Sequence, residues 1–206
     1  FLFIAHLGWV DPEITNLVPV LKSFWLSVHV SVITASYGFL GIGCLLGVLT
    51  LVLFSLNNFN YDNKKHINLL VCTIEAYLIF GLTLLLIGNF LGGIWANESW
   101  GRYWGWDPKE TWCYISIIVY VLTLHLRLIK KIYSDFLFIT CSVIAYASIL
   151  MTYFGVNFYL SGKHSYASGD PIVLPSGFIV TFIILSALIL VAYRGYIIKN
   201  DIPSKP

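Results

Sequence analysis

Residues 24–54 read FWLSVHVSVITASYGFLGIGCLLGVLTLVLF, a run without a single Asp, Glu, Lys or Arg. The hydrocarbon core of a bilayer is about 30 Å thick, so about 20 consecutive apolar residues are enough to cross it as a helix. This run is therefore predicted to span a membrane, and it sets the class of the whole chain.

Four further segments meet the same criterion. They cover about 67–94, 111–128, 136–156 and 177–198. Short polar stretches alone separate the segments, and the sequence contains no internal repeat. The predicted fold is all-α: a single domain over 1–206, built as a polytopic transmembrane bundle of about five helices.

The composition supports this class. Of the 206 residues, 58% are hydrophobic and 11% are charged, whereas soluble domains carry about 25% charged residues. The net charge of +2 is too small to indicate a nucleic-acid surface. The four cysteines lie in apolar runs without a C-x-x-C pair, so they are expected to be small buried residues rather than a zinc or redox site. They are Cys44, Cys72, Cys113 and Cys141.

The distribution of basic residues predicts the orientation, because Lys and Arg favour cytoplasmic loops. Eight lie on the side of the C-terminus and four on the other side. The eight are Lys64, Lys65, Arg127, Lys130, Lys131, Arg194, Lys199 and Lys205; the four are Lys22, Arg102, Lys109 and Lys163. The C-terminus is therefore expected in the cytoplasm and the loop 93–112 on the outer face.

The outer loop is rich in tryptophan. Residues 95–112 read W-A-N-E-S-W-G-R-Y-W-G-W-D-P-K-E-T-W and hold five of the seven tryptophans: Trp95, Trp100, Trp104, Trp106 and Trp112. An interfacial aromatic belt is the alternative interpretation, but belts are much less dense. Indole faces offer wide, rigid contact areas, and glycines allow a close backbone approach. Such a surface suits a large, flat, apolar ligand with polar edges, and a porphyrin fits this description.

A helix start follows the loop. Asp107 is predicted to cap the helix and Pro108 to occupy its first position. Glu110, three residues after Asp107, completes a capping-box pattern that anchors the third span below the loop.

The string WGRYWGWDPKETW at 100–112 resembles the WWD signature of haem-handling proteins. The resemblance is to the CcsA (ResC) type of cytochrome c biogenesis protein, including the C-terminal part of fused CcsBA synthetases. It implies that the chain exports haem b across the membrane and holds it at an external site. There it would promote thioether attachment to the C-x-x-C-H segment of apocytochrome c, as a haem lyase within a larger protein or complex. The start on Phe1-Leu2-Phe3 agrees with a chain that continues an earlier part.

The resemblance assigns three histidines. By topology, His29 near the outer end of the first span and His164 in the loop 157–176 can both approach the tryptophans. The resemblance makes them the axial ligands of the external haem iron. It makes His125, within the third span, a haem ligand of a transmembrane entry site. Without the resemblance, a packed helix-end residue, a solvated loop residue and a hydrogen-bonded core residue are the alternatives.

The remaining site residues follow from the resemblance and from charge. The resemblance places the five loop tryptophans and Asp107 around the haem. Its propionates need counter-charges, which Arg102 or Lys109 would supply. Glu75, a carboxylate within the second span, is expected to accept a hydrogen bond from a neighbouring helix or to help order the cytoplasmic-side site. No residue is expected to act as a catalytic nucleophile, because the apocytochrome brings its own thiols.

Partners and location are implied in the same way. The partners would be apocytochrome c, an N-terminal CcsB-like portion or subunit, and membrane lipid; a thiol-reducing protein is a further candidate, and no nucleic acid is expected. The location would be a bacterial inner membrane or an equivalent energy-transducing membrane, with the tryptophan loop on the periplasmic side.

Two alternatives stay open from sequence. A CcmC-like protein would deliver haem to a separate chaperone and would also use a WWD loop between two outer histidines. A polytopic transporter or assembly subunit without haem would use its aromatics only to ring the membrane interface. The second alternative predicts no haem in the purified protein.

Overall fold

The computed structural model describes residues 23–56, 64–160, 162 and 176–201, and within these ranges all regular structure is helical. The elements are α2 (Phe24–Leu56), α3 (Lys64–Trp100), α4 (Pro108–His125), η3 (Leu126–Leu128), α5 (Asp135–Leu150), η4 (Met151–Gly155), α6 (Val156–Tyr159) and α7 (Ser176–Asp201). Five helical segments are long and apolar enough to cross a membrane. The predicted five-span bundle is confirmed, and the chain is a multi-pass membrane protein.

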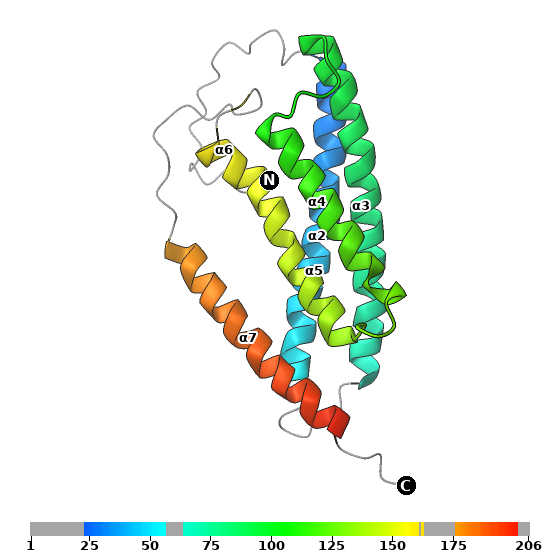
Figure 1. The fold of residues 1–206 in the computed structure, drawn as a ribbon, viewed down its shortest axis with the longest axis vertical. Coiled ribbons are helices and arrows are strands. Elements are labelled where there is room, and N and C mark those ends of the chain that lie inside the picture. Colours follow the sequence, from blue (N-terminus) through cyan, green and yellow to red (C-terminus); the bar gives the residue numbers. More distant parts are fainter. Residues whose placement is uncertain (1–22, 57–63, 161, 163–175, 202–206) are drawn as a thin grey trace.

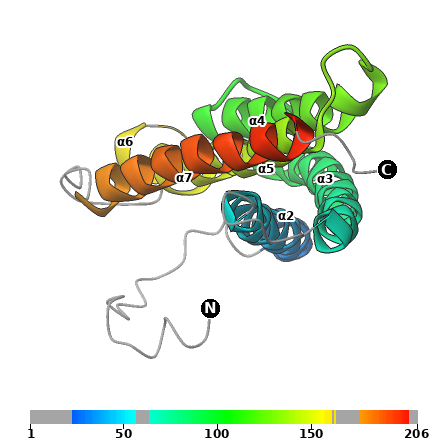
Figure 2. The ribbon, with the colours of Figure 1, turned by 90° about the horizontal axis from the view of Figure 1, so that it is seen from below.

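Helices α2, α3, α4 and α5 run side by side along the long axis of the molecule (Figure 1). Helix α7 packs against α2 and α5 near its C-terminal end and diverges from them toward its N-terminal end (Figures 1 and 2). Its ring contacts join Tyr196 to Phe54 and Phe136, and Tyr193 to Phe136, with centroids 5.5–5.8 Å apart. The bundle proper is therefore formed by α2 to α5.

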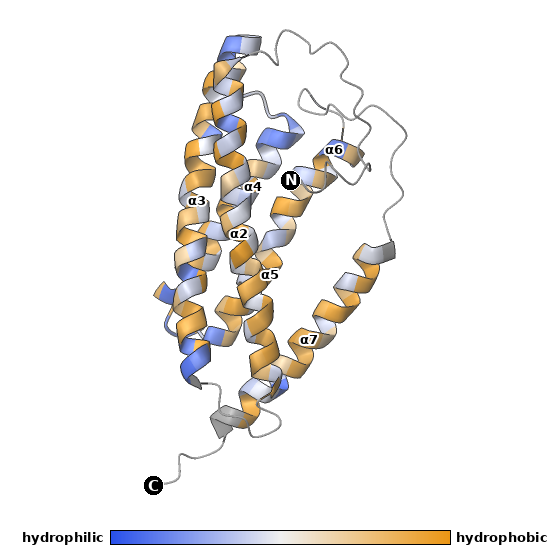
Figure 3. Ribbon diagram, turned by 180° about the vertical axis from the view of Figure 1, so that it is seen from behind, coloured by the Kyte–Doolittle hydropathy of each residue, from blue (hydrophilic) through white to orange (hydrophobic). Residues whose placement is uncertain are grey.

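The spans consist mainly of hydrophobic residues (Figure 3). Large apolar side chains on them are widely exposed, such as Leu45 at 70%, Phe90 at 75% and Phe182 at 72%. Water would disfavour so much exposed apolar area, whereas lipid accepts it.

Glycines bring α2 and α3 into close contact. A Cβ on Gly81 would lie 2.5 Å from Leu40 Cδ2, and one on Gly88 would lie 2.6 Å from Ile33 Cδ1. Small residues at such positions let helices approach closely in a membrane, where packing replaces the hydrophobic effect as the main attraction.

The tryptophan-rich segment is more helical than the sequence indicates. Helix α3 continues to Trp100 and α4 begins at Pro108, so the irregular part covers only residues 101–107. Asp107 is the N-cap of α4, and its capping box with Glu110 is formed as predicted. Apolar periodicity stops near residue 94, which is why the sequence places the end of α3 too early.

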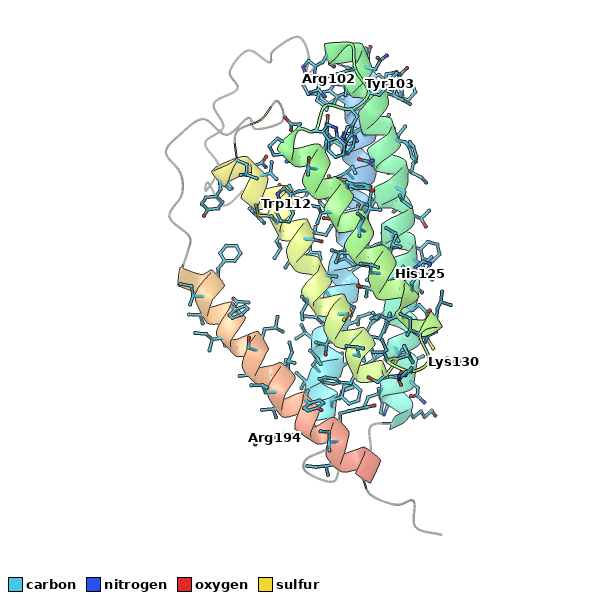
Figure 4. The ribbon with its side chains drawn as sticks, viewed as in Figure 1. Arg102, Tyr103, Trp112, His125, Lys130 and Arg194 are labelled. Carbon is cyan, nitrogen blue, oxygen red and sulfur yellow. The ribbon has the colours of Figure 1, made fainter. Side chains whose placement is uncertain are left out.

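The two ends of the bundle differ in character. We call the end with Trp95, Trp100 and residues 101–107 the tryptophan end, and the end with Lys65, Arg127 and Lys130 the basic end. Figure 4 shows Arg102 and Tyr103 at the former and Lys130 and Arg194 at the latter.

The cysteines are only partly as expected. Cys113 is buried and Cys44 and Cys141 are half-buried, but Cys72 is exposed. The expectation of burial is wrong for Cys72, because an apolar run in a membrane helix has a lipid-facing side as well as a core side.

Candidate functional site

A cavity of about 360 Å³ opens at the tryptophan end, between α2, the end of α3, the 101–107 segment, the start of α4, and η4 with α6. Pockets for small molecules and cofactors span about 300–1,000 Å³. The lining residues described are Leu26, His29, Val30, Ile33, Thr34, Tyr37, Asn89, Gly92, Gly93, Trp95, Tyr103, Trp104, Lys109, Glu110, Cys113, Thr152, Tyr153, Asn157 and Phe158. The cavity is thus a mainly aromatic and aliphatic site with a few polar groups.

His29 borders this cavity in a fixed tautomer. Its Nδ1 lies 2.7 Å from the backbone oxygen of Gly88 on α3. A carbonyl oxygen only accepts, so Nδ1 carries the proton and the lone pair of the neutral ring is on Nε2. Histidines that bind metals are commonly oriented by such a bond from the other ring nitrogen.

Two neighbours set the plane of the His29 ring. The indole of Trp95 is stacked on it, with centroids 6.3 Å apart and planes 10° from parallel. On α3, a Cβ at Gly92 would lie 2.7 Å from His29 Cε1. Only a glycine leaves room for the imidazole in this position.

The tryptophans divide into two groups. Trp95 and Trp104 line the cavity; Trp95 is only 1% exposed and meets Trp100 edge-on at 4.8 Å. Trp106 is 70% exposed and meets Trp104 edge-on at 5.7 Å. Trp100, Trp106, Trp112 and Asp107 are outside the described lining set.

Trp106 has an unusual backbone. Its φ of 57° lies in the left-handed region, which bulky residues rarely adopt because of steric cost. Strain of this kind concentrates at functional sites, where the surroundings hold it in place.

Glu110 organises the 101–107 segment. Its Oε2 accepts hydrogen bonds from the backbone N–H groups of Gly105 at 2.8 Å and Asp107 at 3.1 Å. Its Oε1 lies 3.5 Å from Nη1 of Arg102. One carboxylate therefore ties the loop to the first turn of α4. The sequence predicts the capping box but not the contacts to Gly105 and Arg102.

The far wall contains an irregular helical turn. The π-helical turn η4 places Thr152 and Tyr153 in the lining, and Thr152 Oγ1 lies 3.1 Å from Ser116 Oγ of α4. Single π-turns in α-helices are frequent at functional sites. Sequence reasoning missed Tyr153 and Asn157, because neither carries a motif.

His125 lies elsewhere. It is the last residue of α4, toward the basic end (Figure 4), and its side chain is exposed. Its Nδ1 is 2.7 Å from the backbone oxygen of Val121, so its neutral ring also has the lone pair on Nε2. The structure therefore does not bring His125 together with His29.

Arg127, two residues after His125, is the centre of an ionic network at the basic end. Arg127 Nη1 is 2.5 Å from Glu75 Oε2, and its Nε donates to Tyr133 Oη at 3.3 Å. Tyr133 in turn donates to Asp135 Oδ1 at 2.8 Å, and burial together with this bond raises the pKa of Tyr133. Glu75 thus connects α3 to the η3 turn at the basic end.

His164 lies outside the described residues. Gly162, two positions earlier in the chain, is described, and a Cβ on it would lie 2.6 Å from Asp107 Oδ1. Gly162 therefore lies against the cap of α4.

Comparison with known proteins identifies similar chains. A family model described as cytochrome C assembly protein matches residues 1–164. The protein NrfI of Wolinella succinogenes is 61% identical over 98% of this chain, which corresponds to 22% of that protein. The cytochrome c biogenesis proteins CcsA of Prochlorococcus marinus and Guillardia theta are 37% and 40% identical. These alignments cover 80% and 73% of this chain, and 62% and 56% of the two proteins. The chain thus spans about a fifth of the first relative and about three fifths of the other two.

Proposed function

This chain belongs to the cytochrome c assembly protein family, and from that membership we propose that it holds haem b in the cavity at the tryptophan end and promotes its attachment to apocytochrome c. The CcsA relatives, which are cytochrome c biogenesis proteins by name, support the general role. The specific steps are proposals, because the chain spans only part of the length of these relatives.

The observation that carries the proposal is the setting of His29. It combines an Nδ1–H bond to Gly88 with a parallel indole from Trp95, beside a cavity with mostly apolar lining. Haem requires an imidazole with its lone pair on one nitrogen, flat apolar contacts for the ring, and polar groups at one edge. The residues present fit each of these needs.

We assign His164 as the second axial ligand of this site. The support is the resemblance of the sequence to the WWD family and the position of Gly162 against Asp107. Two imidazoles would leave the iron six-coordinate, and the histidine of the C-x-x-C-H segment could replace one of them.

The chemistry asked of this chain is mainly orientation. Each thiol of the apocytochrome adds across a vinyl group: a carbon–sulfur bond forms, and the other vinyl carbon gains the hydrogen. The substrate supplies its own nucleophiles, so the chain has only to hold a vinyl carbon about 3–3.5 Å from the sulfur and exclude competing geometries. Trp104 and Tyr103, which line the cavity, would limit how the ring can turn.

We further propose that haem reaches this site from the cytoplasmic side through His125. An exposed histidine within a membrane span is costly unless it has a partner or a ligand. The lone pair on Nε2 gives His125 the form needed for iron. Its partner would come from a CcsB-like portion or subunit outside these residues.

The proposed location is a bacterial inner membrane or an equivalent energy-transducing membrane. The basic end would face the cytoplasm, because Lys and Arg favour that side. The tryptophan end and its cavity would then face the periplasmic side, where apocytochrome c and a thiol-reducing protein would meet it.

The test is the visible spectrum of the full-length protein, purified in detergent from haem-replete cells. We expect a low-spin spectrum of a bis-histidine haem in the wild type and its loss in the His29→Ala, His164→Ala double variant. His66→Ala is the matched control, because His66 is an exposed histidine in the first turn of α3 at the basic end.

A colourless wild type would overturn the proposal. The tryptophan end would then have to be a membrane-interface or protein-binding surface. A spectrum that survives the double variant unchanged would place the haem elsewhere.

A further inference from the structure

One cation borders the cavity among its described lining residues. Lys109 lies in the first turn of α4 and is half-buried. Its Nζ donates to Asn157 Oδ1 of α6 at 2.9 Å and lies 5.9 Å from the centroid of the Tyr153 ring. Both partners are uncharged, so neither of them compensates the charge of the ammonium. Burying a cation in this way is unfavourable unless an anion compensates it.

The nearby carboxylates have other partners. Glu110 also lines the cavity, but it pairs with Arg102 and accepts two backbone N–H bonds. Asp107 caps α4, where it accepts from the backbone N–H of Lys109 at 3.3 Å. Within the described part of the chain, no carboxylate lies within ion-pair distance of the Lys109 ammonium. Its charge thus remains available to a ligand in the cavity.

We propose that Lys109 and Asn157 form the subsite that binds a carboxylate of the ligand, which for haem is a propionate. The inference rests on the proposed function and deepens it. Because Asn157 Oδ1 accepts from Lys109, its amide N–H₂ is a donor that can serve the same carboxylate. An ammonium and an amide together give a charge-assisted pair of hydrogen bonds.

The structure distinguishes Lys109 from Arg102, the other cation that the sequence offers. Arg102 lies 3.5 Å from Glu110 and 5.7 Å from the Trp100 ring centroid, and it is outside the described lining set. Its charge is therefore engaged in holding the 101–107 segment.

This subsite would fix how the ligand is turned. A porphyrin bound only through its iron can rotate about the bond to His29 of α2. A second contact at one edge, from α4 and α6, removes that rotation and decides which edge faces the mouth of the cavity. Fixing one orientation is the type of contribution that speeds a reaction by positioning. The subsite thus selects the vinyl edge that meets the apocytochrome.

The test compares haem with its dimethyl ester, in which both propionates lack charge. Full-length protein from haem-deficient cells is titrated with each ligand, and only binding that is lost in His29→Ala is counted. We expect the wild type to bind haem about tenfold or more tightly than the ester, as a charge-assisted hydrogen bond implies. In Lys109→Met this preference disappears through weaker binding of haem, while the affinity for the ester is unchanged.

Two variants serve as controls. Lys130→Met makes the same change of charge at an exposed position of the basic end and should keep the full preference. Asn157→Leu should lose part of it. If Lys109→Met fails to bind the ester through His29, its fold is disturbed. The test then rests on whether the preference for haem over the ester is smaller in Asn157→Leu than in the wild type.

Equal affinities of the wild type for haem and ester would overturn the inference, and so would a preference that survives in Lys109→Met. Neither result touches the proposed function, which fails only if no His29-dependent binding of either ligand occurs.

Discussion

His29 and His125 have the same tautomer but different surroundings. Each donates its Nδ1–H to a backbone oxygen 2.7 Å away. The acceptor of His29 is Gly88 on another helix, and a cavity with a stacked indole adjoins the ring. The acceptor of His125 is Val121 on its own helix, and the ring is exposed.

This difference shows how much of each site these residues supply. The His29 site takes walls from α2, α3, α4, η4 and α6, so most of its shape exists within this chain. The hydrogen bond described for the His125 ring is to α4 itself. A haem entry site at His125, as proposed, would need a further element to enclose it.

The largest expected effect separates the two histidines directly. In cells, His125→Ala should abolish formation of c-type cytochromes, because haem made in the cytoplasm would lose its entry ligand. The purified variant should still bind added haem through His29 with an unchanged spectrum. Haem staining of cytochromes and a haem titration measure the two parts. Loss of both together would show that the two sites are not separable.

Gly92→Ala tests how tightly the His29 ring is held. The added Cβ would lie 2.7 Å from Cε1 and 2.9 Å from Nδ1, so the ring must move away from Gly88. Overpacking costs about 1–3 kcal/mol, so we expect about tenfold or greater loss of haem affinity. Gly38→Ala on α2 is the matched control, because a Cβ there meets nothing within 4 Å. An unchanged affinity in Gly92→Ala would mean that haem binding does not depend on this position of the His29 ring.

Glu110→Ala probes the loop that closes the cavity. It removes the acceptor of the Gly105 and Asp107 N–H groups and the partner of Arg102. Loss of a helix cap costs about 0.5–2 kcal/mol, and we expect a lower midpoint of thermal unfolding in detergent. Glu110→Gln should recover part of the loss, because its amide oxygen still accepts. Equal midpoints for the wild type and Glu110→Ala would show that the loop is held by other contacts.

The smallest expected effect concerns the basic end. Glu75 and Arg127 form an ion pair, but their side chains are 23% and 38% exposed. Partly exposed pairs contribute about 0–1 kcal/mol. A double-mutant cycle with Glu75→Gln and Arg127→Met should give a coupling energy in that range, with no change in the His29 spectrum. A much larger coupling energy would mean that the Glu75–Arg127 pair contributes more to stability than a partly exposed ion pair does.

Much of the fold is readable from the sequence, because the bilayer imposes a simple rule on length and polarity. The five spans and the capping box of Asp107 follow from local patterns, and the structure confirms both. The placement of His29 beside Trp95 follows the predicted topology of the tryptophan end.

Other features depend on contacts between distant segments. Trp95 is buried inside α3 rather than in a loop, because it packs against His29 across two helices. The hydrogen bond from Lys109 to Asn157 joins residues 48 positions apart. No local pattern announces such a pair, and the choice between Arg102 and Lys109 therefore requires the structure.

The π-helical turn η4 shifts the phase of the helix that contains it. One extra residue in a turn rotates everything after it by about 100° relative to an uninterrupted α-helix. Asn157 and Phe158 follow η4 and face the cavity in this rotated frame. If the same sequence continued as an uninterrupted α-helix through Met151–Gly155, the residues after it would be rotated and Asn157 would no longer face Lys109. Which side chains form this wall of the cavity thus depends on the number of residues in the η4 turn as well as on their identity.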